Sequence, residues 1–113
     1  MSWQIDPHSG GNKIPSALYE KLQAQAHAYE QTCSWHPKHS IKLRFKNQFC
    51  YVDSCEEGHD PDPLCRLRYF EPDRWSFAFF TYSNERYEPC LFPNGEWFGT
   101  IEQAIEASSL YLG

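Results

Sequence analysis

The sequence has no apolar run long enough to span a bilayer, and its N-terminus has no basic segment followed by an apolar one. No membrane span or signal peptide is therefore visible, and we expect a cytoplasmic protein that does not contact a membrane. Outside an oxidising compartment, an odd number of cysteines indicates free thiols, most of them buried. These cysteines are Cys33, Cys50, Cys55, Cys65 and Cys90.

Signatures of catalysis are also missing. There is no glycine-rich loop that could cradle a phosphate, no nucleophile elbow and no zinc-protease helix. Carboxylates gather at residues 56–62, but without the ligand spacing of an EF-hand. Cysteine and histidine could pair as nucleophile and base, yet such pairs are recognised by geometry and nothing local marks one. We predict that the protein is not an enzyme and has no cofactor.

Positive charge is in the minority. The chain has ten Lys and Arg residues against fifteen Asp and Glu residues, and its net charge is -5. Since non-specific binding to a phosphate backbone needs clustered cations, this balance argues against nucleic acid as a partner. Only local clustering of the cations could overrule it.

Aromatic residues are abundant, at 17% of the chain, and the most apolar stretch is built from them. Residues 75–82, Trp-Ser-Phe-Ala-Phe-Phe-Thr-Tyr, are apolar in both phases of a two-residue period. This pattern is typical of a strand that is covered on both faces. We therefore place the stretch in the middle of a sheet, with the rest of the chain as its cover.

Two segments with a helical period flank the predicted strands. The first segment, residues 15–32, begins with a proline that suits a first helical turn. Its helical period aligns an apolar stripe of Leu18, Leu22, Ala26, Tyr29 and Cys33. The polar residues Glu20, Lys21, Gln25 and Glu30 lie away from that stripe. Residues 100–103, Thr-Ile-Glu-Gln, match a capping box, and the helix that follows aligns Ile101, Ala104, Ile105, Ser108 and Leu112. Residues 1–12 are predicted to be a flexible leader, and residues 13–113 a single domain.

Between the helices the period is two, which predicts strands at residues 41–45, 49–53, 64–70, 75–82 and 86–92. Residues 54–63 are acidic, contain two prolines and are predicted to form a surface loop. Pro89 marks the last strand as an edge, because proline cannot donate to a ladder. The fold class is α+β, an antiparallel sheet of about five strands with an N-terminal and a C-terminal helix packed on one face.

The main candidate binding site is a set of basic residues on one face of this sheet. Alternation groups Lys42, Arg44 and Lys46 on the first strand, and Arg66 and Arg68 on the third. Arg86, in the turn before the last strand, is expected to border them. Such a surface could bind phosphates, carboxylates or an acidic protein. The plain alternative is that these cations only solubilise an exposed face.

A second candidate is an aromatic surface beside the edge strand. The small core does not need all of the aromatic residues Trp75, Trp97, Phe98 and Tyr87, so some are expected to stay exposed for a protein partner or a second copy. Trp97 and Phe98 could instead pack under the second helix. If Tyr69 or Tyr82 faced solvent beside the arginines, single-stranded nucleic acid would become a candidate ligand. The double-stranded-RNA-binding domain has a similar order of elements, but the acidic second helix here excludes it.

The alternative to a binding role is a zinc site or a catalytic site that depends on cysteine and histidine. Soft ligands gather around the acidic loop at Cys50, Cys55, His59 and Cys65. A further group, Cys33-x-x-His36-x-x-His39, ends the first helix. Zinc needs four convergent ligands, commonly in Cys-x-x-Cys pairs, and the chain has no such pair. Core cysteines and solvent-exposed histidines account for the same pattern.

Two runs in the second half of the chain are Arg-Trp-Ser-Phe-Ala-Phe-Phe-Thr-Tyr-Ser-Asn-Glu-Arg-Tyr-Glu-Pro at residues 74–89 and Phe-Pro-Asn-Gly-Glu-Trp-Phe-Gly-Thr-Ile-Glu-Gln-Ala at residues 92–104. With these runs, the chain resembles a family of small bacterial, notably cyanobacterial, proteins without an assigned function. Residues 49–53 and 64–69 share in the resemblance. It implies a bacterial, stand-alone, soluble domain, and brings no catalytic residue, cofactor or substrate. From its residues, the sequence predicts a non-catalytic binding module that uses the basic sheet face or the aromatic surface.

Overall fold

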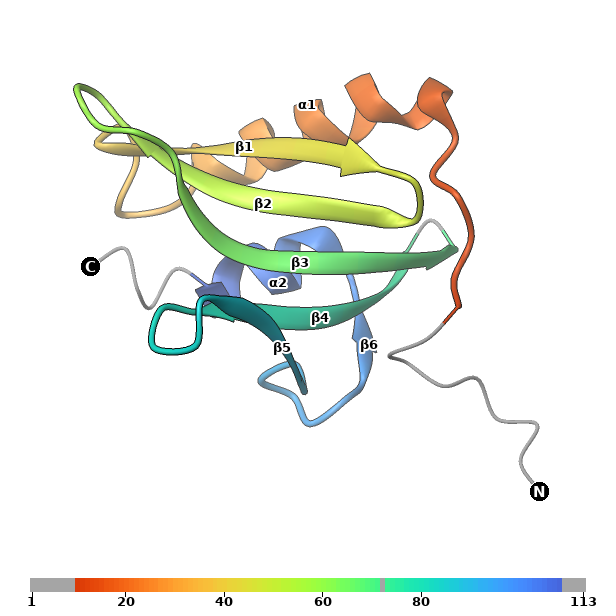
Figure 1. Ribbon diagram of the computed structural model, residues 1–113. Coiled ribbons are helices and arrows are strands. Elements are labelled where there is room, and N and C mark those ends of the chain that lie inside the picture. The colour runs from red at the N-terminus through yellow and green to blue at the C-terminus, as the bar shows by residue number, and fades with distance from the viewer. Residues whose placement is uncertain (1–9, 72, 109–113) are drawn as a thin grey trace.

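The computed structural model describes residues 10–71 and 73–108 (Figure 1). Its helices are the short 3-10 helix η1 (Ser16–Leu18), α1 (Tyr19–Glu30) and α2 (Ile101–Ser108). Its strands are β1 (His39–Lys46), β2 (Phe49–Glu56), β3 (Asp62–Glu71), β4 (Arg74–Thr81), β5 (Arg86–Cys90) and β6 (Phe98–Gly99). Within this described part of the chain, no helix is long and apolar enough to cross a membrane.

The strands form one antiparallel sheet in the order β1-β2-β3-β4-β5, and β6 pairs with β4 next to β5. Figure 1 views this sheet with both helices behind it, α1 along β1 and α2 across β3 and β4. The predicted α+β class, with the two helices packed on one face of the sheet, is therefore confirmed. The two-residue strand β6 is an addition, because so short a segment has no period of its own.

The aromatic stretch forms β4, an interior strand between β3 and the pair β5 and β6. Trp75 and Phe77 are fully buried on the helix side, where α2 contributes Ile101 and Ile105 to the same core. On the opposite side Ser76 and Ala78 are also buried. Burying both phases of one strand removes its apolar surface from water and explains its position inside the sheet.

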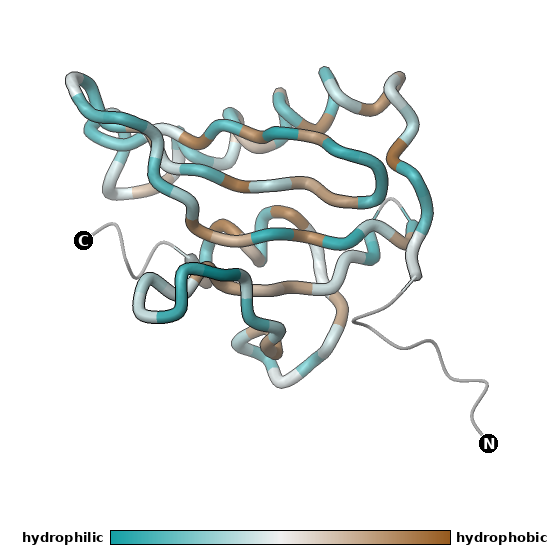
Figure 2. Tube along the Cα trace, in the orientation of Figure 1, coloured by the Kyte–Doolittle hydropathy of each residue, from teal (hydrophilic) through white to brown (hydrophobic). Residues whose placement is uncertain are grey.

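A tight turn joins β1 to β2 and fixes their register. Asn47 has a positive φ of 55°, a conformation that asparagine tolerates and that suits a two-residue hairpin turn. The strands predicted at residues 41–45 and 49–53 therefore form a hairpin. Figure 2 shows hydrophobic and hydrophilic residues alternating along β1 and β3, in keeping with one face toward the helices and one toward solvent.

The predicted loop at residues 54–63 is shorter in the structure. β2 continues to Glu56, and β3 already begins at Asp62. Pro63 can join β3 because the ladder between β2 and β3 shifts its register beside it, between Val52 and Asp53. Such an irregularity accommodates a residue that cannot donate a hydrogen bond.

Helix α1 lies against the outer edge of β1 and satisfies the polar backbone groups of that edge. The Leu43 N–H donates to Oε1 of Gln23 at 3.0 Å, and Nε2 of Gln23 donates to the Ile41 carbonyl at 3.3 Å. The Ile41 N–H donates to Oε1 of Glu30 at 3.1 Å. Glu30 was expected away from the buried stripe, yet it is only 3% exposed because its carboxylate accepts this hydrogen bond.

The capping box predicted for α2 is present. The Thr100 N–H donates to Oε1 of Gln103 at 2.8 Å, and the Gln103 N–H donates to Oγ1 of Thr100 at 3.2 Å. The predicted stripe is buried at Ile101, Ala104, Ile105 and Ser108, while its last member, Leu112, lies outside the described residues.

Part of the predicted leader is attached to the sheet. The Asn12 N–H donates to the Tyr69 carbonyl at 2.8 Å, and the Asn12 side chain donates to the Phe70 carbonyl at 2.8 Å. Arg68 donates to the Gly10 carbonyl at 2.9 Å. Residues 10–12 therefore run along the end of β3, and the remaining leader residues, 1–9, lie outside the described part.

Candidate binding face

Cross-strand register gathers the cations of β1 and β3 on the sheet face opposite the helices. Two rows cross β1, β2 and β3, formed by Arg44, Tyr51 and Arg66, and by Lys46, Phe49 and Arg68. Lys42 pairs with Asp53 in a third row. Because directly paired residues project from the same side of a sheet, these five basic side chains share one surface. We call this surface, defined by Lys42, Arg44, Lys46, Arg66 and Arg68, the basic face.

Aromatic rings lie beneath the arginines of the basic face. The guanidinium carbon of Arg66 is 4.4 Å from the centre of the Phe49 ring and 5.4 Å from that of Tyr87. Arg68 lies 4.7 Å from Phe49, and Arg44 lies 4.9 Å from Tyr51. Each such contact stabilises the pair by roughly 0.5–2 kcal/mol. Stacking uses the flat side of a guanidinium, whereas anions are recognised by the N–H groups at its edge.

One arginine of the face already has an acidic partner. Nε of Arg44 donates to Asp53 at 2.6 Å, and a second nitrogen of the same group donates at 3.1 Å. This hydrogen bonding raises the pKa of Arg44, and it compensates the charge of Asp53, which is 4% exposed. Reversing the charge of Arg44 would leave a buried carboxylate beside a second one, so Arg44 has a structural role.

The two lysines of the basic face have the opposite character. Lys42 and Lys46 are exposed, and no ion pair of either is found with the described residues. They lie on β1 on either side of Arg44. Their charge is therefore not compensated by a neighbouring acid within the described chain, and it adds to the potential of this surface.

Between Arg66 and Arg68 the sheet surface has a small hollow of about 30 Å³, lined also by Ser76, Ala78 and Pro89. The hollow exists because the β4 residues beneath it, Ser76 and Ala78, have small side chains. Nε of Arg66 is buried and has no hydrogen-bond partner among the described residues. A hollow of this size has room for one water molecule or one oxygen atom of an anion.

Arg86, which the sequence grouped with this site, is not part of the basic face. On β5 it is Tyr87 that pairs with Phe80 and faces the arginines, so alternation directs Arg86 to the other side. There Arg86 pairs with Glu88 at 3.4 Å. The sequence prediction for this residue is corrected, because the phase of β5 depends on its pairing with β4.

The proposed metal ligands do not converge. No group of three or more His, Cys, Asp or Glu side chains that could hold a metal ion occurs in residues 10–71 and 73–108. Cys50 and Cys65 lie in the core on the helix side, Cys55 lies near the end of β2, and His59 is exposed in the turn that follows. Cys50 and Cys65 share the helix side of the sheet, but the alternation of β2 directs Cys55 to the opposite side and His59 lies in the turn beyond it. Nothing in this arrangement favours the zinc or catalytic alternative.

The buried thiols are unsuited to nucleophilic chemistry. Burial raises the pKa of Cys65 to about 12, against a smaller lowering by a hydrogen bond with Ser108. Burial raises the pKa of Cys50 well above its usual value, and that of Cys90 to about 11. A thiol that stays protonated at neutral pH is a poor nucleophile.

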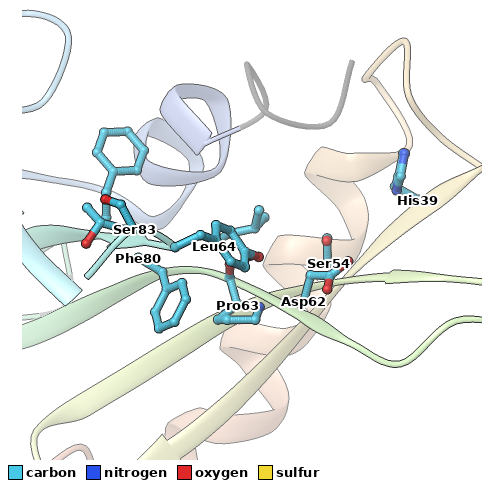
Figure 3. A pocket seen from close by; sticks show the side chains of 10 residues that line it. His39, Ser54, Asp62, Pro63, Leu64, Phe80 and Ser83 are labelled. Atoms are coloured by element: carbon cyan, nitrogen blue, oxygen red, sulfur yellow. The ribbon is translucent and has the colours of Figure 1, made fainter. Parts of the chain in front are cut away.

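A larger cavity, of about 350 Å³, lies where β2 and β4 end and β1 and β3 begin (Figure 3). It is lined by His39, Ser54, Asp62, Pro63, Leu64, Phe79, Phe80, Thr81, Tyr82 and Ser83. In Figure 3 Ser54 and Asp62 lie close together, whereas His39 stands apart from both. Titratable groups are thus spread around the cavity, and they do not form a pair that could act as acid and base.

The aromatic rings under the arginines are the residues that sequence reasoning missed. Phe49 and Tyr51 were only placed in a strand, and Tyr87 was assigned to the edge surface. Single-stranded nucleic acid was a candidate ligand on the condition that Tyr69 or Tyr82 faced solvent; Tyr69 is buried in the core, and Tyr82 is 61% exposed. The hairpin turn at Asn47 was the available signal, because it fixes which β2 residues face the cations of β1.

Comparisons with protein-family models, with curated proteins and with solved structures find no match to this chain. The resemblance to a bacterial family therefore stays a prediction. The geometry of the basic face is the observation that bears on function.

Proposed function

We propose that this protein is a non-catalytic binding module that holds an anionic partner on the basic face. The observation that carries the proposal is the register of β1, β2 and β3, which aligns five cations on the side of the sheet that neither helix covers. The chain as a whole has a net charge of -5. Concentrating half of its ten basic residues on one surface creates a local potential opposite in sign to that of the whole molecule.

The charge of this surface is only partly neutralised by its own acids. Asp53 pairs with Arg44, which leaves Lys42, Lys46 and Arg66 to attract an anion. Arginines stacked on rings are held in place before a ligand arrives, so less side-chain freedom is lost on binding. This arrangement supports binding more than it supports simple solubility, which exposed lysines would supply without the rings.

The proposal is tested on a heparin column, with a matched pair of variants. Lys42→Glu/Lys46→Glu alters the basic face, and Lys21→Glu/Lys38→Glu alters exposed lysines on α1 and before β1. Each reversal changes the net charge by two, so both double variants have a net charge of -9. We expect the wild type to be retained at low salt, the first variant to elute in the flow-through, and the second to be retained.

Two results would contradict the proposal. If the wild type were not retained, the basic face would not attract a polyanion. If both double variants lost retention to the same extent, the effect would come from total charge and would not be local. Circular dichroism of each variant confirms that the fold is intact, which is expected because the four lysines are exposed.

A further inference from the structure

The aromatic rings of the open sheet face form a continuous path that begins under the arginines. The ring of Phe49 lies 6.1 Å from that of Tyr51, and Tyr51 lies 5.4 Å from Tyr87. Tyr87 lies 5.1 Å from Phe80, and Phe80 lies 4.9 Å from Tyr82. The path therefore crosses from β2 to the turn after β4 in five rings. It ends at Tyr82, which is among the most exposed large apolar side chains described, at 61%.

Cations accompany this path along its first part. Arg66 lies over both Phe49 and Tyr87, so it covers the point where the path passes from β2 toward β5. Lys42 and Lys46 border the path on β1. The surface thus offers positive charge and flat aromatic surface side by side. A partner that carries only carboxylates would use the charge and gain little from the rings.

We propose that the anionic partner is single-stranded nucleic acid, with phosphates on Lys42, Lys46 and Arg66 and with bases stacked from Tyr87 to Tyr82. The inference rests on the proposed function of the same face and names its ligand. Proteins that bind single strands combine a basic surface with rings on which bases stack. The sheet face is open and none of its described elements projects from it to enter a groove, so a single strand fits it better than a duplex.

The net negative charge of the protein weakens its binding to a negatively charged strand. Repulsion between an acidic protein and a polyanion lowers the affinity at low salt, so binding depends on the few local cations. For a single strand the logarithm of the binding constant falls with the logarithm of salt concentration by about 0.7 for each phosphate neutralised. With three cations engaged, we expect a slope of about -2.

The test compares two fluorescent strands of the same length and charge by fluorescence anisotropy. One is a twelve-nucleotide thymidine DNA strand, and the other has the same phosphates and sugars but no bases. We expect the thymidine strand to bind at least about fivefold more tightly, since stacking one base on an aromatic ring has about that effect. Tyr82→Ala should weaken this preference without changing the affinity for the strand that lacks bases.

Two variants of Tyr82 separate the ring from its hydroxyl. The Tyr82 hydroxyl donates to the Pro63 carbonyl at 2.9 Å, so replacing the residue by alanine also removes a hydrogen bond. Tyr82→Phe keeps the ring, and we expect it to keep the preference for bases. Tyr87→Leu is a second probe of the path, because leucine still packs against Arg66 but offers no flat ring.

Each result has a definite meaning. If both strands bound equally, or if heparin bound and neither strand did, the basic face would remain an anion site and the nucleic-acid proposal would fail. If heparin failed to bind as well, the proposed function itself would fail. A preference for bases that survived both Tyr82→Ala and Tyr87→Leu would place stacking outside this path and overturn the proposal.

Discussion

Individual side chains in this protein differ sharply in how far burial controls their ionisation. Cys65 is 0% exposed, and burial raises its pKa to about 12, whereas an unfolded thiol titrates near 8.5. Above that lower value the unfolded state loses a proton that the folded state still binds. Stability must therefore fall as the pH rises, first where the unfolded thiol ionises.

We predict that the free energy of unfolding decreases by about 2 kcal/mol more between pH 7 and pH 10 in the wild type than in Cys65→Ala. Urea unfolding of both proteins at the two pH values measures the difference. Between pH 6 and pH 7 the thiol is protonated in both states, so the two proteins should respond alike there. Equal losses at pH 10 would show that Cys65 does not titrate in this way.

Arg44 differs from the neighbouring cations Lys42 and Lys46 in having an acidic partner. Lys42 and Lys46 lie on the same side of β1 and form no ion pair with the described residues, yet Arg44 binds Asp53 through two nitrogens. A variant that reverses Arg44 would mix a loss of ligand with a loss of stability. The lysines are therefore the better residues for testing binding.

At the scale of elements, the contact between α1 and β1 has the most direct consequence for stability. Gln23 bonds to both the N–H of Leu43 and the carbonyl of Ile41, so one side chain replaces part of a neighbouring strand. Without it, two backbone groups of β1 would lose their partners. An unsatisfied group costs about 1–3 kcal/mol when it is buried, and less where water can reach it.

We predict that Gln23→Ala lowers the free energy of unfolding by about 1 kcal/mol and speeds hydrogen exchange at the Leu43 amide. Alanine favours helix more than glutamine does, so a loss of stability would not arise from helix propensity. Lys21→Ala, an exposed position on the same helix, is the control and should leave exchange at Leu43 unchanged. Equal exchange rates in the two variants would contradict the role of Gln23.

Features that are determined by residues close together in the chain could be predicted from the sequence. The capping box at Thr100, the hairpin turn at Asn47 and the buried phases of β4 each depend on residues close together in the chain. β6, the burial of Glu30 and the start of β3 at Asp62 depend instead on strands that are distant in sequence. An alternating pattern predicts on which face of the sheet a residue lies. It does not predict which residue of the next strand lies beside it, so such pairing cannot be derived from the pattern.

The same distinction applies to the candidate site. Alternation was enough to group the cations of β1 and of β3 before the register was known. Arg86 was misplaced because its face depends on where β5 begins to pair with β4. The rings of Phe49 and Tyr51 were not linked to the arginines, since only the cross-strand register places them under Arg44 and Arg66.

At the scale of the whole molecule, the stability of the fold comes from one apolar core between the sheet and the helices. The core is closed by Trp75, Phe77 and Phe92 together with residues of both helices. Soft ligands lie within it or around it, but no three of them meet in the described part of the chain. A chain of this length can bury enough apolar surface to fold without a metal ion.

We predict that a chelator leaves the melting temperature unchanged, because no group of side chains that could hold a structural metal ion is found in residues 10–71 and 73–108. Differential scanning fluorimetry with and without EDTA measures the shift, and native mass spectrometry of the untreated protein measures any bound zinc. A fall in melting temperature together with the release of one zinc per chain would revive the alternative based on Cys50, Cys55, His59 and Cys65.

The bonds that Gln23 and Glu30 make to β1 also limit how copies of the protein can assemble. A sheet grows by adding strands at its edges, and growth without limit requires two edges that can accept one. Here the edge at β1 is occupied by α1 at Ile41 and Leu43, so among residues 10–71 and 73–108 the β5 side is the edge left to receive a strand from another molecule. Two copies joined there would have no accepting edge left, and assembly by strand pairing would stop at a dimer.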